Sequence, residues 1–405
     1  MRSKISKTII LLLILYTGFP LTGSGQVQVM TLRQAVERAR ENYPAIKAAE
    51  LEVERQKAMK AMAIDLGTTS LYTGKEEVGN GGQGINNRIG INQNEIDLLG
   101  IPAKSRLART RTESAETGLG FTEASVVKDV RSVWYKAVYA KEQWLLFRQL
   151  DSLYADFRKA AELRYKTQAT SKIEYLSAST KYQEVKIDIK TAESNYRASL
   201  KMLNQYLMLE GDFDIDTEVS ESDLFSVSSA ADSLNSSPEL GYYSSLIKVS
   251  EAEWKAERAG FLPKFDAGYA SQSVDGNRGY HLWQVGISVP LLFFSQSGKT
   301  KASKINYQIV NKQYEQKVIE VTTRYDQLLS RYLILKDVIG YYNENALQLA
   351  NEQIEASNLA YRLGSIDYVQ FIQNIESAIR IKQEYLIKRN EFFELSVQLK
   401  YLTGK

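Results

Sequence analysis

The sequence has no cysteine among its 405 residues and only one histidine, His281. The lack of cysteine excludes a disulfide framework, a thiol nucleophile and a lipid-modified cysteine. Zinc sites are built mainly from cysteine and histidine, so a single histidine gives no basis for one. The carboxylates are numerous but scattered at helical spacing, as is typical of solvated faces. We therefore expect no enzyme activity, no catalytic residue, no cofactor and no bound metal.

Long apolar runs are also scarce, and the only clear one is TIILLLILY near the start of the chain. It follows Arg2, Lys4 and Lys7 and precedes LTGSGQ, the order typical of a secretory signal peptide. The run is shorter than the ~20 apolar residues of a membrane-spanning helix. We expect residues 1–25 to be removed by cleavage after Gly25. Since no later run is long enough for a spanning helix, residence in a membrane would require a β-barrel.

The chain has no marked excess of charge of either sign. It contains 51 Lys and Arg against 48 Asp and Glu, and residues 1–25 hold three of the basic residues and no acid. The mature chain would therefore be neutral. A neutral protein lacks the basic surface that binds phosphate backbones, which argues against a nucleic-acid partner.

Two distant segments carry the same interrupted helical pattern. LRYKTQATSKIEYL at 163–176 resembles LAYRLGSIDYVQFI at 359–372. Each predicts a helix that ends in a tight turn before a second helix begins. Alignment of Tyr165 with Tyr361 sets an offset of 196 residues.

The same offset holds far upstream of the turns, where it places RIGINQN at 88–94 on QVGISVP at 284–290. An offset shared by separate segments indicates an internal duplication. We interpret the mature chain as a first structural repeat, an acidic and serine-rich linker, and a second repeat. Their bounds are 26–209, 210–237 and 238–405.

Each repeat is expected to contain a helix, two strands, and two long helices joined by a turn. The helices are predicted at 31–63, 105–166, 170–209, 238–260, 298–361 and 367–402. The strands are predicted near 68–78, 86–98, 265–274 and 281–292. Apolar residues in the long helices recur at alternating steps of three and four, as in Val318, Val321, Tyr325 and Leu328. That spacing predicts coiled-coil packing.

The strand predicted near 281–292 has two unlike faces. Its alternate residues Trp283, Val285, Ile287, Val289 and Leu291 are apolar, and the residues between them are mostly small or polar. This alternation is typical of a strand with lipid on one side and water on the other, although a soluble hairpin would also alternate. Because four strands cannot close a membrane barrel, several copies of the chain would have to share one.

With these features the chain resembles the outer-membrane efflux family, the TolC-like channels. The matching segments are TLRQAVERARENYPAIKAAE, FLPKFDAGYA, VGISVPLLFFSQSGKTKASK and the two turns. The first repeat, in AIDLGTTSLYTGKEEVGNG and ELRYKTQATSKIEYLSA, looks most like the branch that serves heavy-metal efflux pumps of the RND type.

The resemblance implies an α-helical and membrane β-barrel protein in the outer membrane. It would be a homotrimer, with a twelve-stranded barrel in lipid and a tunnel of long coiled-coil hairpins across the periplasm. It would be a passive conduit that docks a periplasmic adaptor and, through it, an inner-membrane RND pump, and its cargo would be heavy-metal cations. Multidrug efflux and type I secretion are alternative roles for the same channel. A periplasmic coiled-coil adaptor or scaffold is the alternative outside this class.

The resemblance also implies roles for residues at the two turns. The residues that would contact the adaptor are in the turns: Lys166, Thr167, Gln168, Arg362, Leu363, Gly364 and Ser365. The residues that would form a periplasmic gate are Tyr361, Glu174, Asp367, Gln370 and Gln373. The sequence departs from the family at Gln168, where glycine is usual, and at Gln370 and Gln373, where inward acids are common.

Overall fold

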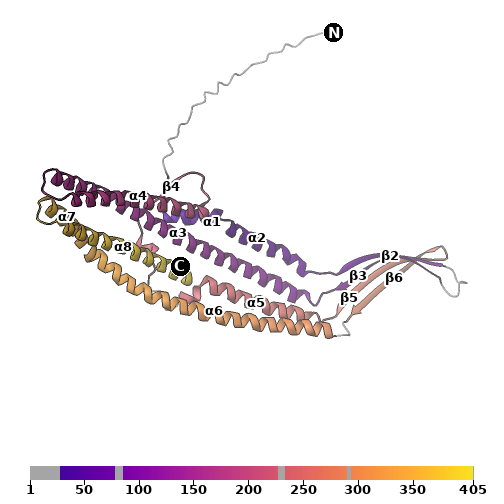
Figure 1. Cartoon of the computed structure of the whole chain (residues 1–405). Coiled ribbons are helices and arrows are strands. Elements are labelled where there is room, and N and C mark those ends of the chain that lie inside the picture. Colours follow the sequence, from indigo (N-terminus) through magenta and orange to yellow (C-terminus); the bar gives the residue numbers. More distant parts are fainter. Residues whose placement is uncertain (1–27, 78–84, 227–232, 290–292, 405) are drawn as a thin grey trace, which may run out of the picture.

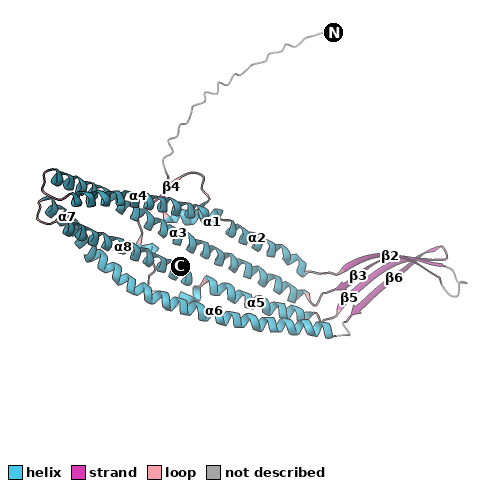
Figure 2. Cartoon of the chain, in the orientation of Figure 1, coloured by secondary structure: helices cyan, strands magenta, loops and turns pink. Residues whose placement is uncertain are grey.

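The computed structural model describes residues 28–77, 85–226, 233–289 and 293–404. Figure 1 shows an elongated molecule in which long helices run side by side and a sheet of strands extends from one end. Helices make up most of its length (Figure 2). The predicted signal peptide, Leu291 and part of the predicted linker lie outside the described residues.

The order of elements agrees with the expected order in both halves of the chain. The first half contains α1 (Leu32–Asn42), α2 (Pro44–Met59), β2 (Thr68–Glu77), β3 (Ile85–Ile96), α3 (Ile101–Lys166) and α4 (Lys172–Leu207). The second half contains α5 (Pro238–Ala259), β5 (Lys264–Val274), β6 (Asn277–Ser288), α6 (Phe294–Tyr341), α7 (Leu347–Arg362) and α8 (Tyr368–Thr403). Hairpin 1 below means α3 with α4, and hairpin 2 means α7 with α8.

Two helices that were expected to be continuous are interrupted. The predicted helix at 31–63 is broken at Tyr43, which is extended with ψ 126°, because Pro44 at the start of α2 disfavours helical backbone in the residue before it. The predicted helix at 298–361 contains a π-helical turn, Tyr342–Ala346, between α6 and α7. A π-helical turn contains one more residue than an α-helical turn, so it changes which residues of the following helix lie on each face.

The strands form one antiparallel sheet in the order β2, β3, β5, β6. The helices joined to them contact one another in the matching order α2, α3, α5, α6. Each strand is therefore continued by its own helix, and the sheet and the helical layer form one curved wall (Figure 1).

The interpretation of 210–237 as a linker outside the core is wrong for part of that segment. Its strand β4 (Phe213–Ile215) pairs in parallel with β1 (Gln28–Met30), and Ile215 is fully buried. The ring of Phe225 is also buried, and its carbonyl accepts a hydrogen bond from the hydroxyl of Tyr332 at 2.6 Å. Short strands with few apolar residues give no periodic signal, so the acidic and serine-rich composition concealed them.

The helices pack around two apolar cores. One core lies at mid-length and includes Trp134, Tyr135 and Leu399, all nearly or fully buried. The other joins the two hairpins near their turns and includes Leu150, Phe157, Phe371 and Ile375. The three-four spacing of the sequence therefore marks packing surfaces, as expected.

Candidate functional site

The two hairpin turns have the same backbone conformation. Gln168 has φ 60° and Gly364 has φ 73°, and these residues are related by the repeat offset. In each turn a backbone N–H just after the positive-φ residue reaches back into the helix, from Ala169 to the carbonyl of Arg164 and from Ser365 to that of Ala360, both at 2.8 Å. Glutamine thus adopts the left-handed conformation that glycine adopts more easily. The departure at Gln168 does not change the shape of the turn.

The helices that leave the turns begin with matched caps. The hydroxyl of Ser171 accepts a hydrogen bond from the N–H of Glu174 at 3.3 Å, and the carboxylate of Asp367 accepts one from the N–H of Gln370 at 2.8 Å. Ser171 and Asp367 are again related by the offset. A carboxylate at this position satisfies free backbone donors and favours the helix dipole. Asp367, which was expected at the gate, therefore has a structural role at the start of α8.

All the residues expected to dock an adaptor lie at the exposed end of the hairpins, which Figure 1 shows opposite the sheet. Among these residues Leu363 presents a large apolar side chain that is 72% exposed. Both cationic residues of this set, Lys166 and Arg362, already have partners. Lys166 contacts Glu162 at 2.7 Å within α3, and Arg362 contacts Asp156 of hairpin 1 at 3.3 Å.

The two hairpins are joined by a buried hydrogen bond just inside the turns. The hydroxyl of Tyr361 donates to Oε1 of Glu174 at 2.5 Å, and their exposed fractions are 1% and 4%. The hydroxyl of Thr170 donates to Oε2 of the same carboxylate. Nη1 of Arg164 lies 3.9 Å from Oε1 of Glu174. The two hydroxyl donors and the nearby guanidinium, which makes no hydrogen bond to the carboxylate, offset part of the cost of its desolvation.

The ring of Tyr361 is held by its neighbours. Phe157 and Phe371 lie 5.1 and 4.8 Å from it between ring centroids, and the guanidinium of Arg164 lies 5.1 Å from the ring centre. Burial, followed by the hydrogen bond to Glu174, raises the pKa of Tyr361 well above its usual value. The phenol therefore stays protonated and remains a donor. Sequence patterns had not pointed to Arg164, although it stands next to Tyr165 in the turn motif.

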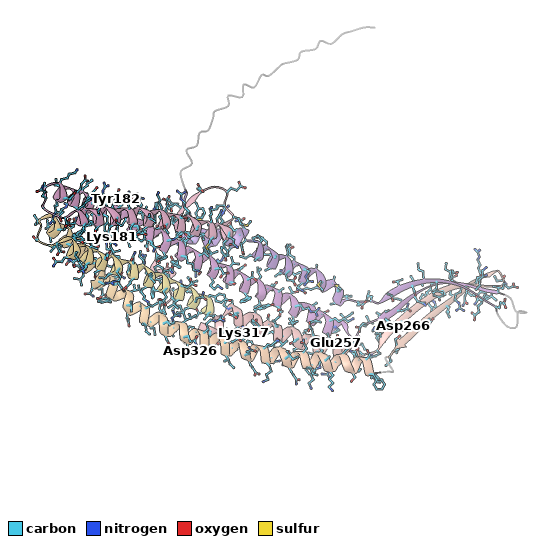
Figure 3. All side chains as sticks on the ribbon, in the orientation of Figure 1. Lys181, Tyr182, Glu257, Asp266, Lys317 and Asp326 are labelled. Atoms are coloured by element: carbon cyan, nitrogen blue, oxygen red, sulfur yellow. The ribbon has the colours of Figure 1, made fainter. Side chains whose placement is uncertain are left out.

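The structure does not bring the other predicted gate residues to this hydrogen bond. Gln370 and Gln373 are exposed on α8. Gln373 lines a groove of about 490 Å³ between α4 and α8 together with Ile173, Leu176 and Val369. Further from the turns, Lys181 bridges from α4 to Glu376 of α8 at 2.9 Å, and Figure 3 labels Lys181 on this part of hairpin 1.

The sheet at the other end has one apolar and one polar face. Leu71, Ile91, Tyr269 and Trp283 are paired in one row across all four strands, so their side chains share a face. On β6 that face continues through Val285 and Ile287, and Val289 follows the strand. Trp283, Val285, Ile287 and Val289 are 77, 84, 64 and 48% exposed.

The opposite face is lined by small and polar residues. One of its rows is Ser70, Asn92, Gly268 and Gln284. Gly90 lies beneath the ring of Tyr72, where an added Cβ would come within 2.6 Å of ring atoms. At the helix end of this face, Asp266 accepts hydrogen bonds from the N–H of Glu95 at 2.7 Å and the hydroxyl of Ser288 at 2.5 Å, in the position labelled in Figure 3. In the single chain, both faces of the sheet are exposed.

This architecture matches that of solved outer-membrane channels. CusC, whose crystal structures concern folding and transmembrane channel formation, has a TM-score of 0.77 at 16% identity, with 92% of this chain and 91% of that chain covered. The Campylobacter jejuni outer membrane channel CmeC has 0.75 at 14% identity, with 92% and 85% covered. The open state of the Neisseria gonorrhoeae outer membrane channel MtrE has 0.74 at 15% identity, with 92% and 88% covered.

The sequence agrees with the structural comparison. Residues 230–405 match the family model described as outer membrane efflux protein. The chain has the TolC-like channel fold. The resemblance inferred from the residues is therefore confirmed. Comparison of the sequence with curated proteins gives no match.

The family model that matches residues 230–405 describes efflux proteins, which are transport proteins. Within residues 28–77, 85–226, 233–289 and 293–404, no three His, Cys, Asp or Glu side chains are grouped as a metal site would require. In the same part of the chain, no helix combines the length and the apolar character needed to cross a membrane.

Proposed function

We propose that three copies of this chain form a passive channel through the outer membrane. The single observation that carries the proposal is the sheet, in which an exposed apolar face crosses all four strands and the opposite face is polar. Lipid fits the first face and water fits the second. Trp283, Val285, Ile287 and Val289 would face lipid, as would Leu291, which lies outside the described residues.

The edges of the sheet support assembly from several copies. β2 and β6 are the edge strands, and each pairs with a single strand within the described chain. An open strand edge in lipid leaves backbone donors and acceptors without partners. Pairing of β6 of one copy with β2 of the next would close the wall, and three copies would contribute twelve strands. The helices that continue the strands would then extend the tunnel into the periplasm.

The hairpin turns would form the periplasmic end of this tunnel. Their exposed residues Thr167, Gln168, Leu363, Gly364 and Ser365 offer a site for a periplasmic adaptor, together with the cationic pair Lys166 and Arg362. The adaptor would in turn hold an inner-membrane RND pump. Since the sequence has no phosphate-binding loop of the GxxxxGK[ST] type, the pump would supply the energy and this channel would be a conduit.

The hydrogen bond between Tyr361 and Glu174 would act as a gate latch. It joins the end of α7 to the start of α4, so separation of the hairpins would have to break it. Binding of adaptor and pump would favour the open arrangement through contacts that the closed arrangement lacks. Gln370 and Gln373 would give this end a neutral lining, and the carboxylate of Asp367 would remain the nearby acidic group.

Fractionation of cells tests the membrane proposal. The expected result is a chain in the outer-membrane fraction that migrates as a trimer in mild detergent and as a monomer after heating. A chain found only in the soluble periplasmic fraction as a monomer would overturn the proposal and favour an adaptor or scaffold.

The cargo is proposed to be heavy-metal cations, on the basis of the branch that the first repeat resembles. The test is complementation of a host that lacks its own outer-membrane channel, with the cognate adaptor and pump supplied. Raised tolerance to copper, silver, zinc or cobalt salts is expected. Tolerance only to dyes and antibiotics would favour the multidrug alternative, and export of a polypeptide would favour type I secretion.

A further inference from the structure

The helix ends next to the sheet are rich in basic residues. The segments 55–64, 101–112 and 294–312 contain three, four and four Lys or Arg and no Asp or Glu. They include the end of α2 and the starts of α3 and α6. The end of α5, at 255–264, adds three basic residues against one acid. Since the mature chain as a whole is neutral, these segments form a basic belt where the helices meet the sheet.

Part of this belt lines a groove of about 470 Å³ between α3 and α5. Its charged lining residues are four cations and two acids, a net charge of +2. They are Arg106, Arg109, Lys248, Lys255, Glu113 and Glu251. Lys255 contacts Glu251 at 2.5 Å. In the part of the chain that the structure describes, Arg106, Arg109 and Lys248 have no acid within ion-pair distance, and all three are exposed.

The cations on the opposite side of α3 are already paired with acids. Lys104 and Arg111 share that side because they are seven residues apart in a helix. Lys104 contacts Asp97 at 2.9 Å, and Arg111 contacts Glu253 at 2.9 Å. The groove between α3 and α5 therefore gathers unpaired cations from two helices, and it has room for an anion from outside the chain.

The strands run in a fixed order when the apolar face of the sheet is viewed with the helices below it. Tyr269 turns its side chain toward the viewer. Odd-numbered residues of β5 point their N–H groups toward β3, as Asp275 does in its hydrogen bond to the carbonyl of Ile85. In a strand of L-residues that runs upward, N–H groups of residues whose side chains face the viewer point to the right. The helices below therefore follow as α6, α5, α3 and α2 from left to right.

This order decides on which side of the wall the groove opens. α3 descends from the sheet, and a right-handed helix that descends winds clockwise when seen from above. Glu116 contacts α2 on the right, and Ser114 contacts α5 on the left. At 100° per residue, the clockwise path from Glu116 to Ser114 passes Arg109 and then Arg106 on the near side. The groove therefore opens on the same side of the wall as the apolar face of the sheet.

The groove lies just below the apolar part of the wall. Leu98, Leu99, Leu262 and Phe294 are exposed where the strands pass into the helices. Arg106 is five residues from the start of α3, about 8 Å along the helix, and side chains on a helix lean toward its N-terminus, here toward the sheet. The polar layer of each bilayer leaflet is about 5–8 Å thick. In the proposed channel, the groove is thus at the depth of lipid phosphates.

We propose that this groove binds the headgroup of an anionic glycerophospholipid in the periplasmic leaflet of the outer membrane. Its phosphodiester would contact the guanidinium groups of Arg106 and Arg109, which suit phosphate oxygens, with Lys248 at the lower end of the groove. Its acyl chains would lie along the apolar face of the sheet. This inference rests on the proposed outer-membrane channel and identifies the lipid that its wall selects.

The charge of the groove favours an anionic lipid over a zwitterionic one. A zwitterionic headgroup carries an ammonium group beside its phosphate, and the unpaired cations of the groove would repel that group. The apolar face next to the groove favours a lipid over a free anion, because only the lipid joins a phosphate to apolar chains. A phosphatidylglycerol-like headgroup satisfies both conditions.

Native mass spectrometry of the purified trimer tests the proposal with defined probes. The probes are phosphatidylglycerol and phosphatidylcholine with identical acyl chains, each titrated into the detergent-solubilised trimer. We expect wild type to bind up to three phosphatidylglycerol molecules, one per copy, and to bind them about tenfold or more tightly than phosphatidylcholine. Arg106→Gln with Arg109→Gln should weaken phosphatidylglycerol binding about tenfold or more and leave phosphatidylcholine binding unchanged. If this double variant forms no trimer, Arg109→Gln alone replaces it, with an expected weakening of about fivefold.

The control variant is Lys190→Gln with Lys201→Gln, which removes the same charge from exposed positions on α4, away from the sheet (Figure 1). It should bind phosphatidylglycerol as wild type does. A wild-type trimer that binds both lipids equally, or an arginine variant that binds like wild type, would overturn this inference and leave the proposed channel intact. Displacement of the lipid by inorganic phosphate at equal concentration would also overturn it, since the site would then recognise a free anion. The absence of any trimer in all variants and in wild type would overturn both proposals.

Discussion

The hydroxyl of Tyr361 and the carboxylate of Glu174 connect two hairpins whose residues are 187 positions apart in the sequence. The contact is buried, and Arg164, Thr170, Phe157 and Phe371 surround it. Few polar contacts between the hairpins are as deeply buried. The pair is therefore a buried polar link between the hairpins, next to the apolar core that also joins them.

Replacement of Tyr361 by phenylalanine should loosen the closed state. The change removes the donor and leaves the Glu174 carboxylate buried with fewer partners, at a cost of about 1.5–3 kcal/mol. A shift of that size in the closed–open equilibrium corresponds to about a tenfold or larger increase in the open fraction. The measurement is entry of a large antibiotic into cells that carry the channel. Tyr342→Phe, which removes an exposed hydroxyl that donates to Glu384 at 3.3 Å, is the matched control and should change entry little.

The latch should not respond to mildly alkaline conditions. Burial raises the pKa of Tyr361. The stabilisation of the closed state by its hydrogen bond is therefore fully present below the ordinary tyrosine pKa of ~10, and it is lost only as the pH rises through the higher pKa of the folded protein. Entry of the same antibiotic should therefore be equal at pH 7 and pH 9. A leak that grows over this range in wild type but not in Tyr361→Phe would contradict the description of the site.

The two faces of β6 should tolerate charge differently. Val285 lies on the apolar face and is 84% exposed, and its neighbour Gln284 points to the polar face. An arginine in the lipid-facing band of a barrel costs about 2–4 kcal/mol near the bilayer midplane. Val285→Arg should thus reduce the yield of heat-sensitive trimer in the outer membrane, and Gln284→Arg should leave it near the wild-type level. Equal yields would argue against lipid at this face.

Much of this fold was predictable because its elements are long and periodic. The three-four spacing placed the long helices, and the alternation around Trp283 placed β6. The offset also placed both turns. The presence of Tyr361 and Glu174 near each other followed from the family resemblance, while the bond itself required the structure.

Other features left no local signal. The parallel pair β1 and β4 is only three residues long in each strand. The pair of Arg362 with Asp156 depends on which helix faces are opposed, and the π-helical turn at Tyr342–Ala346 depends on packing along the whole helix. None of these is encoded by the period or the turn chemistry of a single segment.

The turns allow a test of backbone strain. Gln168 and Gly364 both have positive φ, a conformation that costs a non-glycine residue about 1–2 kcal/mol. Gln168→Gly should raise the midpoint of thermal unfolding of the trimer, partly offset by greater freedom of the unfolded chain. Gly364→Ala should lower it. If both substitutions shift the midpoint in the same direction, the two turns are not conformational equivalents.

A partly buried network around Asp214 of β4 should make stability depend on acid pH. Burial opposes ionisation of Asp214, but hydrogen bonds from Lys141 at 2.7 Å, from Tyr196 and from the N–H of Ile215 outweigh it and lower the pKa of the carboxyl. The stabilisation of the folded chain by these bonds is therefore present above the ordinary aspartate pKa of ~3.9. It is lost as the pH falls through the lower pKa of Asp214 in the folded chain. Tyr196 remains protonated, since burial raises its pKa.

Asp214→Asn is the variant that measures this effect. It should lower stability by about 0.5–1 kcal/mol at pH 7 by leaving Lys141 without its charged partner, because solvent screens a partly exposed pair, and the difference from wild type should shrink below about pH 4. The readout is the unfolding midpoint across this pH range. Asp212→Asn, at an exposed acid in the same segment, should match wild type throughout. A gap between Asp214→Asn and wild type that persists unchanged at low pH would contradict the ionic role.

Conductance in a planar lipid bilayer tests most directly whether copies of this chain enclose a water-filled path. The purified trimer is compared with the variant that combines Tyr361→Phe with Glu174→Gln. We predict discrete conductance steps for both, with larger or longer openings in the variant because the latch is absent. No conductance from either protein, after its insertion into the bilayer has been verified, would contradict the account.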